Sequence, residues 1–353
     1  MNPSIFDEVP PPLNSTNQPT EHEFYFHGTG SEYFKIWIVN LVLIIVTLGF
    51  YSPWAKVRRL RYFYGNTELN GEVFDYTASP KRILIGRLVA LSLYVIISVI
   101  AEISPDLAVL GSAIIFLVMP WLMRSTMRFM ARNSQYNNIR FGFYGKLSTA
   151  YLIMLASVVM SVVSFGLLMP VAWWLFKRYQ FDNTYFGELK FNFNASIWDM
   201  YKAMIIPILI FIGACVAGVL LLGLSFTTGE TNGIIIIFAV LGFYFVLLLI
   251  MPLMQAYTHK AIWQSMTLGE NEFNLDNFNP LTFAFIQATN YICTVLTLGL
   301  FLPWAKVRLH RYKIETLSLI AYDDFDALTT PHMHDESSIA DEINDVFDFD
   351  LSW

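Results

Sequence analysis

Two nearly identical basic and aromatic strings carry the side chains whose types and spacing could do chemistry. The string T-L-G-F-Y-S-P-W-A-K-V-R-R-L-R-Y covers residues 47–62, and T-L-G-L-F-L-P-W-A-K-V-R-L-H-R-Y covers residues 297–312, at a constant offset of 250 positions. Arg and Lys attract phosphate groups, and Trp anchors at membrane–water interfaces. We therefore predict a binding surface for anionic lipid head groups, or another anionic ligand, formed by Trp54, Lys56, Arg58, Arg61, Trp304, Lys306, Arg308 and Arg311. Ordinary anchoring on the positive inner side of a membrane is the more common role of such residues, although close repetition of the whole string exceeds what anchoring needs.

Three polar residues stand inside the apolar stretches that lead into these strings. Asn40 and Asn290 obey the same offset of 250 positions, and Gln287 lies about one helical turn from Asn290. A polar side chain in the middle of a membrane span either bonds to a neighbouring helix or lines a substrate path. We favour bonding between helices.

Motifs of soluble catalysis are missing from the sequence. It contains no G-x-S-x-G, no H-E-x-x-H, no Walker A loop and no Cys-x-x-Cys. We therefore expect no enzyme activity, no catalytic residue, no metal site and no cofactor. Nucleic-acid binding is not expected either, because the basic residues flank apolar stretches instead of forming a soluble patch.

Long apolar blocks must position these residues. Of the 353 residues, 55% are hydrophobic and only 14% are charged, whereas a soluble domain has about 25% charged residues. The apolar blocks cover residues 33–51, 83–103, 107–123, 147–169, 203–224, 233–253 and 283–302. Each is near the roughly 20 residues that cross a bilayer as a helix. Seven membrane segments are therefore expected.

Charge separates the ends of the chain from its middle. The segment before Lys35 and the tail after Tyr322 hold fifteen of the 28 acids and none of the 22 bases. The region between them is therefore strongly basic although the formal net charge is −6. The first 30 residues lack the basic region of a signal peptide, so the first apolar block is expected to direct membrane insertion.

Short β-hairpins are predicted after the apolar blocks. A weaker third copy of the repeated pattern lies at an offset of 117, where Gly166, Pro170 and Asn183 match Gly49, Pro53 and Asn66. After the first copy, the turn residues Asn-Gly at 70–71 lie between alternating residues, which is a strong hairpin signal. Aromatic alternation recurs at residues 24/26, 74/76, 141/143 and 191/193. We interpret these segments as short strands at or near the membrane surface.

The predicted fold is an all-helical membrane bundle with surface β-hairpins. Its seven segments would form an internal duplication, with a three-segment unit repeated and a seventh segment beginning a third copy. The expected divisions are a disordered N-terminal segment at 1–22, membrane repeats at 23–140 and 141–272, a partial third repeat at 273–320 and an acidic tail at 321–353.

The sequence resembles the YjgN family of bacterial inner-membrane proteins. The pattern T-L-G-x-x-x-P-W-A-K-V-R-x-x-R-Y, the N-T…G-E…F-x-F hairpin and the acidic end at 347–351 carry the likeness, which covers roughly residues 20–353. The resemblance implies a multi-pass protein of the bacterial inner membrane. It implies no activity, substrate or site residue, because the family is one of unknown function.

The distribution of bases leaves the topology open. Basic residues follow the first, third, fourth and seventh blocks, whereas the connections at 102–106 and 225–232 hold none. Cytoplasmic loops usually hold the excess of Lys and Arg, so the fourth block would begin and end inside. Either it is re-entrant, as its equivalents the first and seventh would then be, or it spans and the charge rule fails there. Seven full spans with inverted halves are slightly favoured by the block count.

Two functional hypotheses follow. The first is a transporter-like or lipid-handling protein whose partners are membrane lipids, with anionic lipids as the candidates. The second is a non-transporting scaffold or regulator of envelope proteins that works through its acidic tail. The sequence identifies no protein partner.

Overall fold

The chain is built from five consecutive strand–helix–helix–strand units. The computed structural model describes residues 19–103, 105–227 and 233–322. The first unit is β1 (Thr20–Phe26), α1 (Gly30–Val46), α2 (Ser52–Gly65) and β2 (Thr67–Leu69). The second is β3 (Glu72–Tyr76), α3 (Pro80–Ile103), α4 (Pro105–Asn133) and β4 (Ser134–Tyr136). The third is β5 (Ile139–Phe143), α5 (Leu147–Val163), α6 (Met169–Asp182) and β6 (Thr184–Phe186). The fourth is β7 (Leu189–Phe193), α7 (Ile197–Thr227), α8 (Gly233–Trp263) and β8 (Met266–Leu268). The fifth is β9 (Asn271–Asn274), α9 (Pro280–Leu296), α10 (Leu302–Glu315) and β10 (Ser318–Ala321).

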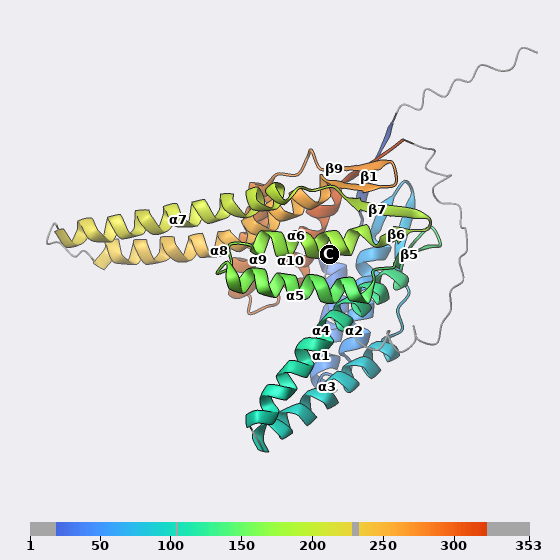
Figure 1. The fold of residues 1–353 in the computed structure, drawn as a ribbon. Coiled ribbons are helices and arrows are strands. Elements are labelled where there is room, and N and C mark those ends of the chain that lie inside the picture. The colour runs from blue at the N-terminus through green and yellow to red at the C-terminus, as the bar shows by residue number, and fades with distance from the viewer. Residues whose placement is uncertain (1–18, 104, 228–232, 323–353) are drawn as a thin grey trace, which may run out of the picture.

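The strands form one closed antiparallel barrel. Its order is β1-β10-β9-β8-β7-β6-β5-β4-β3-β2, so the first and last strands close the ring. His22 pairs with Leu319 across that closure, and Phe24 pairs with Leu69 on the other side of β1. Figure 1 shows the helices extending away from the barrel, with α3–α4 and α7–α8 splaying apart and reaching furthest.

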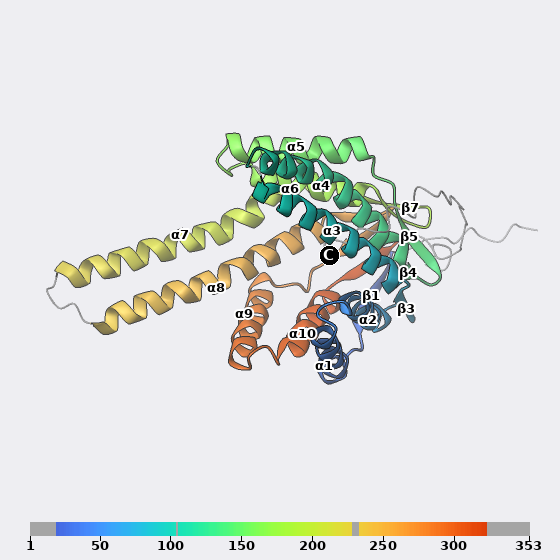
Figure 2. The ribbon, with the colours of Figure 1, turned by 90° about the horizontal axis from the view of Figure 1, so that it is seen from below.

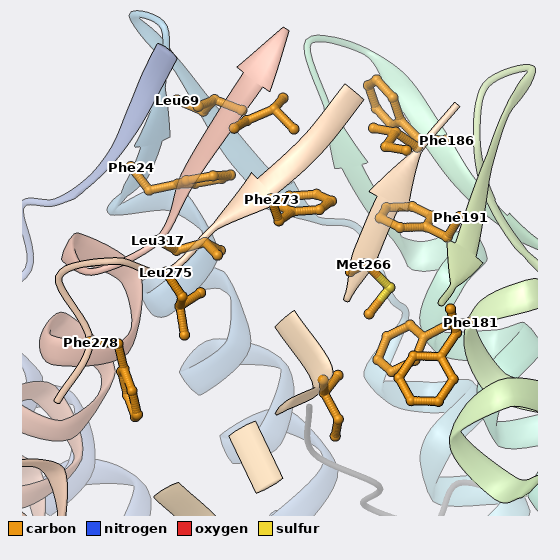
Figure 3. Packing of buried hydrophobic residues seen from close by; sticks show 14 of the residues in the cluster. Phe24, Leu69, Phe181, Phe186, Phe191, Met266, Phe273, Leu275, Phe278 and Leu317 are labelled. Carbon is orange, nitrogen blue, oxygen red and sulfur yellow. The ribbon is translucent and has the colours of Figure 1, made fainter. Parts of the chain in front are cut away.

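Apolar and aromatic side chains fill the inside of the barrel. Alternation sets their direction, because Phe24 and Phe26 are buried while Tyr25 between them is exposed. Phe74 stacks on Phe24 with 6.3 Å between ring centroids. Rings from other strands add to the cluster, and Figure 3 shows Phe24, Phe186, Phe191 and Phe273 directed into one interior. The core of the barrel is thus a packed aromatic layer.

The expectation of an all-α bundle of seven segments is wrong. The surface hairpins predicted from Asn-Gly and Phe-x-Phe patterns do form, as β2–β3 and β6–β7 show. They are not separate, however, because ten strands join into the closed barrel. Three helices in the described part of the chain are long and apolar enough to cross a membrane, over Val109–Asn133, Ile197–Leu220 and Val240–Trp263. The three-segment repeat is also wrong as a unit, since the chain is divided by the barrel strands into helix pairs.

The three apolar blocks with uncertain topology turn back on themselves. Helices α1, α5 and α9 each have 17 residues, and each is followed after a five-residue turn by a helix of 14 residues. The two ends of each helix pair connect to strands that are neighbours in the barrel, for example β5 and β6 in the third unit. The first, fourth and seventh blocks thus follow a helix–turn–helix path whose two ends both lie at the barrel, which is the chain path that the re-entrant alternative expects.

The turns of these three helix pairs share one geometry. Leu48, Phe165 and Leu298 each have φ of 50°, and the glycine that follows each has φ between 86° and 93°. Glycine adopts this left-handed conformation without steric cost, which explains the recurrent Gly-then-Pro signal in the sequence. Pro53 and its equivalents then occupy the first turn of the second helix, where no N–H is needed.

The expected domain boundaries at 140/141 and 272/273 stay predictions. The disordered segment at 1–22 and the acidic tail at 321–353 lie mostly outside the described residues.

Candidate functional site

A groove with a volume of about 490 Å³ runs along α10 where the fifth unit meets the first. Figure 2 shows α10 beside α1 at this seam, with α9 on its other side. The lining residues are Thr29, Gly30, Ile286, Phe301, Trp304, Val307, Arg308, Arg311, Tyr312 and Glu315. Three of them, Trp304, Arg308 and Arg311, belong to the residues predicted to bind an anionic ligand.

The groove is apolar at one end and charged at the other. Phe301 and Trp304 stack at 6.2 Å between centroids beside the turn that precedes α10. Arg308 and Arg311 follow one and two turns later, and Glu315 closes the end of α10 nearest the barrel. The spacing of three to four residues places these side chains on one face of the helix.

Trp304 forms the wall of the groove by packing against the start of α1. Its ring lies 4.9 Å from that of Phe34, and a Cβ added to Gly30 would come within 2.2 Å of Trp304 Cδ1. Only glycine permits this approach. Tyr62 of α2 donates a hydrogen bond to the Thr29 carbonyl at 2.8 Å, which holds the beginning of α1 in place.

The two guanidinium groups are oriented by the protein but keep donors to offer. Arg308 Nη1 donates to Thr289 Oγ1 at 3.0 Å. Arg311 Nη2 donates to the Gly28 carbonyl at 2.8 Å, and its Nε lies 3.7 Å from Glu315 Oε1. These contacts use one donor of Arg308 and two of Arg311, out of five on each guanidinium. The pair with Glu315 is half exposed and therefore weak, so an anion can compete for Arg311.

The basic residues of the first string have a different environment, and none of them lines the groove. Arg58 Nη1 donates to Asn40 Oδ1 at 3.3 Å, and Arg61 Nε donates to the Tyr76 carbonyl at 3.0 Å. Trp54 stacks on Tyr51 at 5.9 Å. Lys56 is buried, whereas Lys306 at the equivalent position is exposed and is not a lining residue of the groove.

The polar residues inside the apolar blocks lie between helices. Asn290 Nδ2 donates to the Ala305 carbonyl at 3.1 Å, joining α9 to α10. Asn40 accepts from Arg58 and so joins α1 to α2. Gln287 Nε2 donates to Tyr291 Oη at 3.1 Å and reaches Gln255 Oε1 of α8 at 3.5 Å.

Sequence reasoning missed the residues that complete the groove, among them Gly30, Ile286 and Tyr312. Tyr312 belongs to the repeated string and could have been included on that ground. Gly30 could not, because its partner Trp304 is 274 positions away and only barrel closure brings them together.

The sequence matches a family model described as a bacterial protein of unknown function (DUF898) over residues 21–346. The chain belongs to this family. It is 31% identical over 161 residues to inner membrane protein YjgN of Escherichia coli O157:H7, and 32% identical over 161 residues to the protein of that name in Escherichia coli K12. A Salmonella typhimurium protein of the same name is 30% identical over 151 residues.

These matches confirm the resemblance to the YjgN family. They cover 42–43% of this chain and 38–40% of the relatives, so the chain spans less than half of their length in these matches. No solved structure matches the sequence.

Proposed function

We propose that the protein is a multi-pass inner-membrane protein that binds a lipid with an anionic head group in the groove along α10. The observation that carries the proposal is the groove itself, with Phe301 and Trp304 at one end and Arg308 and Arg311 at the other. The names of the relatives support an inner-membrane location. We further propose that the first, third and fifth units arose by internal repetition, on the strength of their equal helix lengths and matching strings.

The barrel lies on the cytoplasmic side in this proposal. The turns at 47–51, 164–168 and 297–301 contain no Lys or Arg, nor do the connections at 102–106 and 225–232. Most bases instead lie toward the ends of the helix pairs that join the barrel, and Lys56, Arg58, Lys306 and Arg308 lie nearer the turns. Excess Lys and Arg mark the cytoplasmic side of a membrane protein. One orientation thus satisfies the charge rule for all five helix pairs.

The three short helix pairs enter only the barrel-side leaflet. A helix of 17 residues is about 25 Å long, and it is shorter still along the membrane normal when tilted. Arg58 and Arg308 are exposed six residues after α2 and α10 begin. Crossing roughly 30 Å of hydrocarbon would place these charges deep in lipid at a cost of roughly 2.5–3.5 kcal/mol each. Entry into one leaflet leaves them within reach of head groups.

The turns of these helix pairs have the features of a segment surrounded by lipid. Leu48, Phe165 and Leu298 are 90–96% exposed. In the last turn, the backbone N–H groups from Thr297 to Leu302 all have acceptors. Five of them donate to backbone carbonyls, and the N–H of Phe301 donates to Thr297 Oγ1 at 3.0 Å. The other two turns repeat the pattern with Thr47 and Ser164. Satisfied backbone donors are what irregular structure needs at membrane depth.

The groove suits a lipid better than a soluble anion. Trp and Phe at its membrane end offer contact to an acyl chain, whereas two guanidinium groups offer charge-assisted hydrogen bonds to a phosphate. Because the groove is open at the surface, a lipid can enter it from the leaflet without a gating motion. We propose lipid binding without catalysis.

Lipid binding can be tested by native mass spectrometry of the full chain in detergent, with phosphatidylglycerol and phosphatidylcholine offered in equal amounts. The double variant Arg308→Gln/Arg311→Gln should lose at least about tenfold in phosphatidylglycerol affinity, because each charge-assisted bond contributes about 1.5–3 kcal/mol. Arg178→Gln is the matched control, since Arg178 is the third-unit equivalent of Arg311 and is exposed. Equal binding by the double variant and the control would contradict the proposal.

A further inference from the structure

Four half-buried basic side chains lie on α6, α8 and α10, and the two on α10 are on the side of that helix that faces away from the groove. They are Lys177 of α6, His259 of α8, and His310 and Lys313 of α10. At 100° per residue, Lys313 lies about 200° around the helix from Arg311. The cluster is therefore separate from the lipid groove and does not rest on the proposed function.

Aromatic contacts and electrostatics bring these groups together from three units. Lys313 Nζ lies 5.6 Å from the centroid of Phe283, and the His259 ring lies 6.4 Å from the same ring. Burial, and after it the positive charge of Lys313, lowers the pKa of Lys177 to about 8. Burial lowers the pKa of Lys313 as well. The positive charge of Lys313 on α10 therefore acts on Lys177 on α6.

Among the residues that the structure describes, the cluster is short of counter-charge. Within residues 19–103, 105–227 and 233–322, Lys177 and Lys313 form no ion pair with a carboxylate. Lys177 Nζ donates to Gln180 Oε1 at 3.0 Å and lies 5.2 Å from the ring of Trp173. In the same described residues, the buried Nε2 of His259 has no hydrogen-bond partner.

Contacts with aromatic rings do not by themselves offset the cost of holding the two lysine ammonium groups partly out of water. A cation over a ring recovers only part of what an ammonium group loses on leaving water. Two such groups that also repel each other raise the cost further. A bound anion would offset both effects and would give His259 Nε2 an acceptor.

We propose that α6, α8 and α10 hold a phosphate-type anion between Lys177, His259 and Lys313. The ligand is either free inorganic phosphate or the phosphate of a lipid head group, since both present the same oxygens to the cluster. His310 stands beside the site as a neutral residue, because burial and then Lys313 lower its pKa to about 4. Its Nε2 lies 3.3 Å from Thr67 Oγ1.

The test is the thermal unfolding of the delipidated full chain in detergent at pH 7, in inorganic phosphate and in chloride at matched ionic strength. Phosphate should raise the Tm of the wild-type protein by roughly 3–5 °C. Lys190→Gln, an exposed change on β7, should keep this rise. Lys313→Gln and Lys177→Gln should lose it. A rise of the same size in Lys313→Gln would overturn the proposal.

A second variant distinguishes a ligand site from a structural lysine. Lys313→Met removes a half-buried charge that has no carboxylate partner among the described residues, so it should raise the Tm in chloride while abolishing the response to phosphate. A lower Tm in chloride, together with an unchanged phosphate response, would show that the lysine is structural. The lipid source is tested in the Arg308→Gln/Arg311→Gln background, where the groove no longer binds lipid tightly. If phosphatidylglycerol but not inorganic phosphate raises the Tm there, and adding Lys313→Gln abolishes the rise, the bound phosphate belongs to a lipid.

Discussion

Asn290 shows at the residue scale what a polar group inside an apolar block does in this fold. Its amide is buried and bonds to the Ala305 carbonyl, so it joins the two helices of its own pair. The sequence offered two roles for it, helix bonding or a substrate path. The contacts support the first role, since Asn40 also bonds within its own helix pair, there as the acceptor of an N–H from Arg58.

Replacing Asn290 with Ala should therefore reduce stability without affecting lipid selectivity. The free energy of unfolding should fall by about 1–2 kcal/mol, because one buried hydrogen bond is lost and the Ala305 carbonyl is left without this donor. Thermal unfolding in detergent and native mass spectrometry measure the two effects separately. Unchanged unfolding combined with lost phosphatidylglycerol binding would instead assign Asn290 to the binding path.

Gly30 sets the position of the groove wall, and a single methyl group tests it. In Gly30→Ala the new Cβ would collide with the Trp304 ring, so Trp304 must move into the groove and phosphatidylglycerol binding should fall at least about threefold. Gly65→Ala is the matched control, because a Cβ there meets no atom within 4 Å. If both variants bind lipid equally, the contact between Trp304 and α1 does not shape the site.

The element that most needs explanation is the turn of the short helix pairs. Thr297 Oγ1 accepts the N–H of Phe301 at 3.0 Å while donating to the Cys293 carbonyl at 2.7 Å. In water such a hydroxyl would be replaceable, because solvent could satisfy the same N–H. In lipid it is not, because an unsatisfied N–H there costs several kcal/mol.

Thr297→Val should therefore destabilise the protein more in a bilayer than in a soluble setting. We expect a loss of about 1–3 kcal/mol, whereas Thr297→Ser should be neutral because Ser164 fills the same position in the third unit. Unfolding of both variants in lipid nanodiscs measures the difference. Equal stability of Val and Ser would mean that water reaches the turn.

Elements with a local signal could be predicted from the sequence, and those defined by distant partners could not. The Asn-Gly turn and the Phe74–Tyr76 alternation located β2–β3, and Gly49 with Pro53 located the end of α1. Strand β10 carries no such signal, because Ser318–Ala321 is four residues long and becomes a strand only by pairing with β1 and β9. The groove likewise depends on that pairing, so its basic wall was predicted and its opposite wall was not.

At the scale of the whole molecule, the barrel is the part that unites the five helix pairs. Alternation in β10 gives a matched test of it, because Leu319 is buried in the barrel and its neighbour Ile320 is only partly buried. Leu319→Asp should cost about 3 kcal/mol or more, or prevent folding, because it places a carboxylate in the aromatic core. Ile320→Asp should be far milder. Similar unfolding of the two variants would contradict the closed barrel.

With the barrel on the cytoplasmic side, the short helix pairs must end near the middle of the bilayer. The direct measurement places a fluorophore at Leu298→Cys, in a chain carrying Cys215→Ser and Cys293→Ser, and compares its quenching by lipids brominated at different depths. We predict the strongest quenching by bromines near the ends of the acyl chains, and no labelling of Leu298→Cys by impermeant maleimide from either side. Labelling from the periplasmic side would show that these helix pairs cross the membrane.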